Sequence, residues 1–189
     1  MIGRLRGVLV SSRESGIIID VGGVGYEVSM TTRDLAGLPG IGEEIVVHTH
    51  THVREDDIGV FGFGVEGDRE LFRILLGASG VGPKVAMALL ASMTSDEIVR
   101  AIIGEDPDAL TIAPGVGKRG AQKIVLELSE KLSGRETEIV GGHALGSVRS
   151  ALEGLGYSTA EINGVIKDLD PNEPIQDQVK SALQRLAKG

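Results

Sequence analysis

Two short glycine-containing stretches decide how the centre of this chain folds: Gly80-Val81-Gly82-Pro83-Lys84 and Pro114-Gly115-Val116-Gly117-Lys118-Arg119. Their first glycines, at positions 80 and 115, lie 35 residues apart, and apolar residues with helical spacing flank each stretch on both sides. Because glycine accepts a positive φ and permits close backbone approach, each stretch predicts a tight turn between two helices. Val81 and Val116 have no polar role in such a turn, so we expect them to pack as wedges between the helices.

The second helix of each predicted hairpin begins with residues suited to binding an anion. Backbone N–H groups in the first turn of a helix lack intrahelical partners and lie at the positive end of the helix dipole. Lys84 follows the first turn, and Lys118 and Arg119 follow the second. Two such sites side by side predict a ligand with regularly spaced negative charges, that is, a nucleic-acid backbone.

The charge distribution favours the same kind of ligand. The 189 residues include 27 acidic ones and carry a net charge of −8, which excludes a protein that coats nucleic acid over its whole surface. However, no acidic residue lies within Leu71–Ser95 or Ala109–Leu126. The basic residues of these two windows are Arg73, Lys84, Lys118, Arg119 and Lys123. We therefore expect binding on one face, through the DNA backbone, since aromatic residues for base stacking are few.

The glycine stretches partly match two other phosphate-binding motifs. Gly115, Gly117 and Gly120 match a dinucleotide-binding fingerprint, but a helical run precedes them where that motif needs a strand. A phosphate-binding P-loop would need glycine at Ile112 and Ser or Thr at Arg119, so ATP binding of that kind is not expected. A purely structural helical corner stays open, although two copies with lysine favour a ligand site.

Composition restricts the remaining function classes. Cysteine is absent, which excludes disulfides and thiolate metal sites. The apolar runs are too short and interrupted for a signal peptide or a membrane span, so we expect a cytoplasmic protein.

Residues 1–63 have the pattern of a small β-barrel of the OB type. The five runs of β-branched or alternating residues are Leu5–Val10, Ile17–Val21, Tyr26–Met30, Glu44–Val53 and Ile58–Phe63. A short helix is expected at Thr31–Leu38. Five short strands with one small helical insert are typical of an OB-fold.

Two groups of polar residues near the fourth run have alternative interpretations. His48, His50 and His52 share one strand face, but no carboxylate is placed beside them, which favours a half-exposed strand face over a metal site. Glu55-Asp56-Asp57 form the tip of a predicted hairpin. They are either a solvated turn or a device that repels phosphates and keeps DNA strands apart.

Residues 64–133 predict a domain of about five helices that contains both hairpins. Asp68 is the expected N-cap of a helix through Leu76. Thr94 and Glu97 form a capping box, and Asp106-Pro107 mark the N-cap and first position of a further helix.

The remaining residues predict a linker and a small module. Residues 134–146 are polar and glycine-containing, as in a flexible linker. Residues 147–189 carry three short apolar helix faces, with a capping box at Ser158 and Glu161. This module has no catalytic constellation, so we expect it to bind a partner.

Several stretches together resemble the bacterial RuvA family, and the resemblance spans the whole chain. Besides the two glycine hairpins, they are Met1-Ile2-Gly3-Arg4-Leu5-Arg6-Gly7, Asp20-Val21-Gly22-Gly23-Val24-Gly25-Tyr26-Glu27-Val28 and Val53-Arg54-Glu55-Asp56. The resemblance implies an α+β multi-domain protein with an N-terminal OB-fold, a central all-α double helix-hairpin-helix domain and a C-terminal three-helix (UBA-like) domain.

The resemblance also implies a function and partners. The chain would be a non-catalytic subunit that binds Holliday junctions, which are four-way junction DNA, during recombination and repair. The OB-fold would build a homotetramer, and the C-terminal domain would dock on a RuvB-type hexameric ATPase, with no cofactor or metal in this chain. Pairing of two tetramers on one junction and a contact with a RuvC-type resolvase stay open.

The resemblance assigns roles to three sets of residues. The DNA-binding set is Ser79, Gly80, Val81, Gly82, Lys84, Gly115, Val116, Gly117, Lys118, Arg119 and Lys123. The acidic pin is Glu55 and Asp56, with Asp57 as an additional acid. The motor-binding set is Leu155, Gly156 and Tyr157. Ser79 departs from the asparagine that the family often has before the first hairpin.

Two functions of other classes remain compatible with helix-hairpin-helix motifs. A helix-hairpin-helix DNA glycosylase would carry a catalytic Asp soon after the hairpin, whereas the nearest acids after Gly117 are Glu127 and Glu130 on a helix face. A structural adaptor would use the hairpins without touching DNA.

Overall fold

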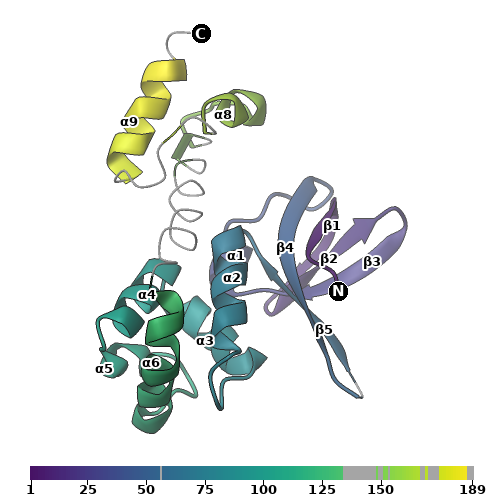
Figure 1. Ribbon diagram of the computed structural model, residues 1–189. Coiled ribbons are helices and arrows are strands. Elements are labelled where there is room, and N and C mark those ends of the chain that lie inside the picture. The colour runs from purple at the N-terminus through teal and green to yellow at the C-terminus, as the bar shows by residue number, and fades with distance from the viewer. Residues whose placement is uncertain are drawn as a thin grey trace.

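The computed structural model describes residues 1–55, 57–133, 148, 151–152, 154–166, 169 and 175–186 (Figure 1). They form a β-barrel, a helical domain and a C-terminal group of helices. The expected linker at residues 134–146 and the central pin residue Asp56 lie outside the described residues.

Five strands close into the expected barrel, in the order β1-β2-β3-β5-β4. They are β1 (Arg4–Arg13), β2 (Gly16–Val21), β3 (Val24–Ser29), β4 (Glu44–Val53) and β5 (Ile58–Phe63). All neighbours pair antiparallel except β3 and β5, which pair in parallel where Ser29 lies opposite Phe61. Alternate side chains fill the barrel, among them Leu9, Ile19 and Val47, so the period-two pattern correctly predicted the inward face.

The helical domain contains five helices, as predicted. They are α2 (Glu66–Leu75), α3 (Pro83–Ser92), α4 (Ser95–Ile103), α5 (Pro107–Leu110) and α6 (Lys118–Leu132). The capping box of Thr94 and Glu97 begins α4, and the Asp106 side chain caps α5 with Pro107 at its first position, which confirms both predictions.

The prediction that Asp68 caps α2 is wrong. The helix begins three residues earlier than this cap implies, at Glu66, and its N-cap Val65 makes no side-chain capping bond. Asp68 instead lies buried in the first turn, where its carboxylate accepts a hydrogen bond from the Ser95 hydroxyl of α4. The acidic side chain therefore joins two helices, a long-range contact that local capping patterns do not reveal.

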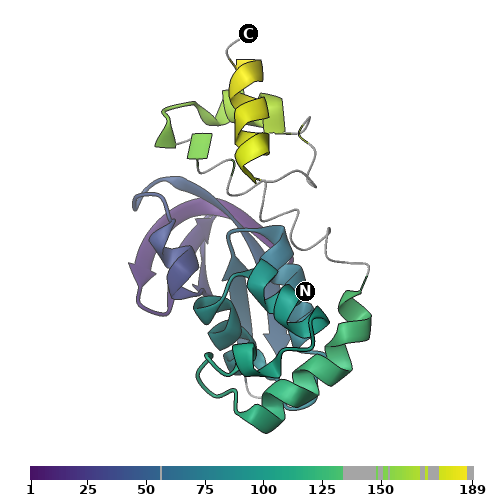
Figure 2. The same ribbon diagram turned by 90° about the vertical axis from the view of Figure 1, so that its left-hand side faces the viewer.

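The helical domain packs directly against the barrel (Figure 2). Phe63 of β5 belongs to the same buried cluster as Phe72 and Leu71 of α2. The short helix α1 (Thr32–Ala36), capped by Thr31, adds polar contacts. Arg33 Nη1 donates to the Met93 carbonyl at 2.8 Å, and the Gly64 N–H donates to Asp34 Oδ1 at 3.0 Å.

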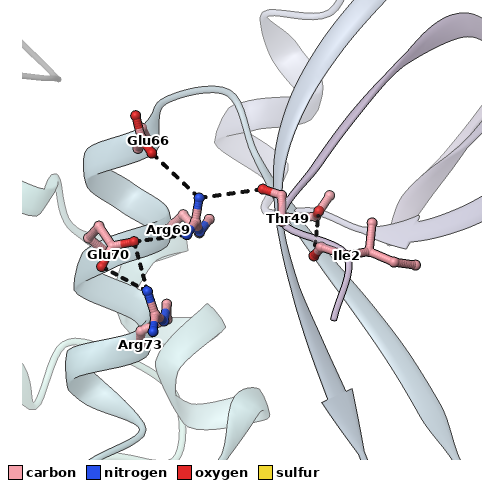
Figure 3. Close-up of polar contacts among 7 residues, drawn as sticks. Ile2, Thr49, Glu66, Arg69, Glu70 and Arg73 are labelled. Carbon is pink, nitrogen blue, oxygen red and sulfur yellow. Dashed lines mark hydrogen bonds and ion pairs between the residues drawn. The ribbon is translucent and has the colours of Figure 1, made fainter.

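Arg69 of α2 forms a second polar contact between helices and barrel (Figure 3). Its guanidinium lies between Glu66 and Glu70, with N···O distances of 3.5 and 3.1 Å, and also donates to the Gly3 carbonyl at 3.4 Å. The Thr49 hydroxyl donates to the Ile2 carbonyl at 2.9 Å, which holds the start of the chain against β4. These contacts fix the helices that carry the glycine hairpins relative to the barrel.

The C-terminal part has its own small core. Helices α8 (Thr159–Ile166) and α9 (Ile175–Leu186) contribute Ile162 and Ala182, which pack with Val148, Leu152 and Leu169. The Ser158–Glu161 capping box is present at the start of α8. The expected first helix of this module lies partly outside the described residues. Across the part of the chain that the structure describes, no helix has the length and apolarity needed to span a membrane.

Candidate nucleic-acid interface

The first glycine stretch forms the predicted hairpin between α2 and α3. Gly80 has a φ of +84°, and the Val81 N–H donates to the Ala78 carbonyl at 3.1 Å. Gly82 is the N-cap of α3, without a side-chain capping bond, and Pro83 is the first helical residue. The start of α3 is therefore not capped by a side chain, which leaves room for an external anion there.

The second stretch repeats this backbone geometry. Gly115 has a φ of +86°, and the Val116 N–H donates to the Ala113 carbonyl at 3.1 Å. Gly117 is the N-cap of α6, again without a side-chain capping bond, and Lys118 is the first helical residue. In both stretches the first glycine has a positive φ, and the valine N–H donates to the carbonyl three residues before it. The prediction of two equivalent hairpins is therefore confirmed.

The two valines pack as predicted. Val81 and Val116 are only 8% and 7% exposed and belong to the core cluster of the helical domain. The flanking glycines Gly80 and Gly115 and the cations Lys84 and Lys118 are exposed. Each hairpin is thus anchored by its valine and presents its backbone to solvent.

Both hairpins face one open groove with a volume of about 240 Å³. It is lined by Ser79, Gly80, Val81, Val85, Gly115, Val116, Arg119, Gly120, Lys123 and Ile124. The structure therefore brings most of the predicted binding residues together, with Arg119 and Lys123 supplying positive charge. Lys84 lines a neighbouring groove instead.

One acidic residue of α6 contacts the start of the first hairpin. Glu127 Oε2 of α6 accepts a hydrogen bond of 2.7 Å from the Ser79 N–H, 48 residues away. Hydrogen bonds from the Ser79 backbone and hydroxyl, with the charges of Lys123 and Lys131, lower the pKa of the Glu127 carboxyl. In the sequence, the four-residue spacing of Lys123, Glu127 and Lys131 indicates that the three side chains share one helix face. It does not indicate the contact with Ser79.

The predicted acidic hairpin joins β4 and β5. Strand pairing continues to Val53 opposite Ile58, and the Arg54 N–H donates to the Asp57 carbonyl at 2.8 Å. Glu55 and Asp57 are exposed near the tip. Asp56 of the predicted pin lies outside the described residues.

The histidines of β4 pack against aromatic rings. The His50 ring lies edge-on to Phe72 at 5.4 Å, and the His52 ring edge-on to Phe61 at 6.5 Å, between ring centroids. Burial lowers the pKa of His48 and His50, which favours their neutral forms. Among the described residues, no group of three or more His, Asp or Glu is arranged to hold a metal ion. The contacts support the interpretation as a half-exposed strand face.

The three residues predicted to bind the motor follow the first helical segment of the C-terminal part. The Tyr157 N–H donates to the Leu152 carbonyl at 3.2 Å, and Gly156 between them has a φ of +90°. These two features are those of a glycine-terminated helix end. Tyr157 packs on the small core, whereas the Leu155 side chain is 61% exposed.

Family models match along the chain. Residues 1–62 match the RuvA N terminal domain, residues 72–130 a SAM-like helix-hairpin-helix tandem, and residues 143–187 the RuvA C-terminal domain. The first two matched ranges coincide with the barrel and with the helices around both hairpins.

Full-length relatives agree with these matches. The chain is 38% identical to the Holliday junction branch migration complex subunit RuvA of Methylibium petroleiphilum over all of both chains. It is 39% identical to that of Rubrobacter xylanophilus over 98% of each chain, and 40% identical to that of Solidesulfovibrio magneticus over 99% of this chain and 98% of the relative. The chain therefore belongs to the RuvA family.

Proposed function

We propose that this chain binds the Holliday junction as a subunit of a branch migration complex, as the names of its relatives describe for them. The observation that carries the proposal is the pair of near-identical hairpins that open on one groove. Each offers an uncapped helix start with a cation beside it, and the two share Arg119 and Lys123.

The DNA would be held through its phosphates. The first-turn N–H groups that make no bond within the helix bind phosphate oxygens; they are that of Lys84 in α3, where Pro83 has none, and those of residues 118–120 in α6. The side chains of Lys84, Lys118 and Arg119 add charge at the same places. Backbone contacts carry no base information, so this interface recognises the shape of the junction and not its sequence. Glycine at positions 82 and 117 keeps side chains out of the way of the approaching strand.

Glu55, Asp56 and Asp57 act as the pin at the crossover. Carboxylates repel phosphates, so a pin at the centre of the junction favours separation of the strands before they pair with new partners.

The role of the pin requires several pins around one centre, which a homotetramer built by the barrel supplies. An exposed face of β1 and β4 supports such an assembly: Val8, Val10 and Val46 are 42%, 49% and 37% exposed there, beside the exposed ion pair of Arg6 and Glu44.

The chain itself performs no bond chemistry in this proposal. The glycosylase alternative needs a carboxylate aimed into a substrate pocket, whereas Glu127 is bonded to the Ser79 amide and flanked by Lys123 and Lys131.

Energy for branch migration comes from a RuvB-type hexameric ATPase that docks on the C-terminal module around Leu155, Gly156 and Tyr157. A junction in bacterial DNA places this work in the cytoplasm.

Titration of labelled DNA with the full chain tests the proposal. Fluorescence anisotropy compares a four-way junction with a linear duplex of the same length, and we expect clearly tighter binding to the junction. Lys118→Ala should weaken binding equally across junction sequences and lower the slope of log affinity against log salt by about one. Equal affinity for junction and duplex would reject junction recognition, and a loss that depends on sequence would reject backbone binding.

A further inference from the structure

A second open groove, with a volume of about 430 Å³, lies between the barrel and α3. Its lining includes Pro83 and Lys84 in the first turn of α3, and Arg54 and Asp57 at the base of the acidic hairpin. The groove therefore touches both the first glycine hairpin and the pin. Through Lys84 it includes one residue of the proposed DNA interface.

The charges in the groove suit a phosphate. Among the described residues that line the groove, Arg54 and Lys84 are exposed cations and Asp57 is the carboxylate, and the hydroxyls of Ser15 and Ser29 add hydrogen-bond donors. Arginine binds phosphate oxygens with paired N–H groups in a fixed geometry, which makes such contacts stronger than those of neutral donors.

Arg54 is held in place by a histidine of β4. Its Nε donates to His52 Nε2 at 3.2 Å. The His52 ring is itself fixed edge-on to Phe61, at 6.5 Å between centroids. Because this bond uses only Nε, the N–H groups of the two terminal nitrogens of the guanidinium remain as donors for a ligand.

Apolar side chains complete the groove. Phe61 of β5 and Met87 of α3 are both half-buried and both belong to its lining. A base can pack against such a surface while its phosphate reaches the cations. The volume falls within the range of about 300–1,000 Å³ that is common for ligand sites, which is sufficient for one nucleotide.

We propose that this groove binds one nucleotide of the DNA strand that runs from the first hairpin to the crossover. Arg54 and Lys84 bind the phosphates on either side of that nucleotide, and Phe61 and Met87 contact its base. His52 is a positioning residue that acts through Arg54. The proposal rests on the proposed function, since it needs a junction bound with the pin at its centre.

The test places 2-aminopurine, a fluorescent adenine analogue, in a four-way junction at the nucleotide next to the crossover. With saturating wild-type protein, we expect fluorescence to rise because the base leaves the DNA stack. Arg54→Gln should abolish most of this rise and weaken junction binding about fivefold to tenfold, while linear duplex binding stays within about twofold. Arg100→Gln is the matched control, because it removes the same charge from α4, where Arg100 pairs with Asp96.

Two variants of His52 separate positioning from structure. His52→Phe keeps an aromatic ring on Phe61 but removes the acceptor, so it should behave like Arg54→Gln. His52→Gln restores an acceptor near the Nε2 position and should recover the fluorescence signal. Equal melting temperatures of the variants by circular dichroism exclude unfolding as the cause.

Several outcomes would overturn the inference. An unchanged signal in Arg54→Gln at saturation would show that the groove does not hold the nucleotide. Equal losses of the fluorescence signal in both His52 variants would reject the positioning role. If Arg54→Gln bound the junction normally but no longer stimulated the RuvB-type ATPase, the ligand of the groove would be a protein. A wild-type protein that binds junction and duplex equally would instead reject the proposed function.

Discussion

Glu127 places a carboxylate beside a surface that we expect to bind phosphates. The side chain accepts the Ser79 N–H at 2.7 Å, so it ties the first hairpin to the helix of the second. Lys123 and Lys131 lie one helical turn away on either side and offset its charge. The residue therefore has two opposite effects: the hydrogen bond orders the hairpins, and the charge repels DNA.

Removing the charge while keeping an acceptor separates these effects. We expect Glu127→Gln to bind the four-way junction about twofold to fivefold more tightly at low salt, because the Gln oxygen still accepts from Ser79 and one repulsion is gone. The gain should vanish at high salt, where screening removes the repulsion. Anisotropy titrations at two salt concentrations measure both values.

Glu130→Gln is the control for this prediction. Glu130 is exposed on the same helix, and its change removes the same charge. Its effect should be smaller, since the Ser79 bond holds the carboxylate of Glu127, and not that of Glu130, beside the first hairpin. Equal gains from the two variants would mean that only the overall charge matters.

At the scale of elements, each hairpin uses its two glycines for different physical reasons. Gly80 and Gly115 have φ values of +84° and +86°, which residues with a Cβ atom adopt only with strain. Gly82 and Gly117 have φ values of −97° and −88°, which any residue adopts. A Cβ atom would meet no neighbour within 4 Å at any of the four positions, so crowding in the free protein does not distinguish them.

Alanine substitutions should therefore divide by position. Gly80→Ala and Gly115→Ala should each lower the free energy of unfolding by about 1–2 kcal/mol, because the left-handed conformation is strained. Gly82→Ala and Gly117→Ala should leave stability nearly unchanged but weaken junction binding, since the new methyl group lies where the strand approaches. Urea unfolding and junction titration of all four variants measure the two properties. Stability losses of the same size at all four positions would contradict this division.

These elements are the part of the molecule that the sequence predicts well. Local signals are sufficient for the barrel strands, the glycine hairpins and the capping boxes, because each depends on residues a few positions apart. Asp68 shows the limit, since its partner Ser95 lies 27 residues away and changes its role from cap to buried contact. Glu127 and Ser79 are likewise 48 residues apart.

At the scale of the whole molecule, the barrel and the helical domain act as one support for the site. Arg33 reaches the Met93 carbonyl 60 residues away, and Arg69 reaches the Gly3 carbonyl 66 residues away. These contacts, with Phe63 in the core of the helical domain, set the distance between the pin and the hairpins. Sequence patterns give no information about such packing, because a side chain's distant partners depend on the completed fold.

The C-terminal module has a separate core, so its proposed task should be separable from DNA binding. Within the part of the chain that the structure describes, that core consists of Val148, Leu152, Ile162, Leu169 and Ala182 and contains no side chain from the barrel or the helical domain. Leu155 is 61% exposed beside the helix end at Gly156, as expected of an apolar residue that a partner covers.

Leu155→Asp in the full chain should therefore uncouple the motor. We expect unchanged affinity for the four-way junction, because the substitution is outside the hairpins, and loss of most of the stimulation of a RuvB-type ATPase on junction DNA. Burying a new charge at the docking surface opposes the contact. Ile175→Asp is the control, because Ile175 is 46% exposed on α9 of the same module and its substitution introduces the same charge. Full stimulation by Leu155→Asp would place the motor contact elsewhere, and parallel loss in both variants would assign the effect to the charge of the module and not to Leu155.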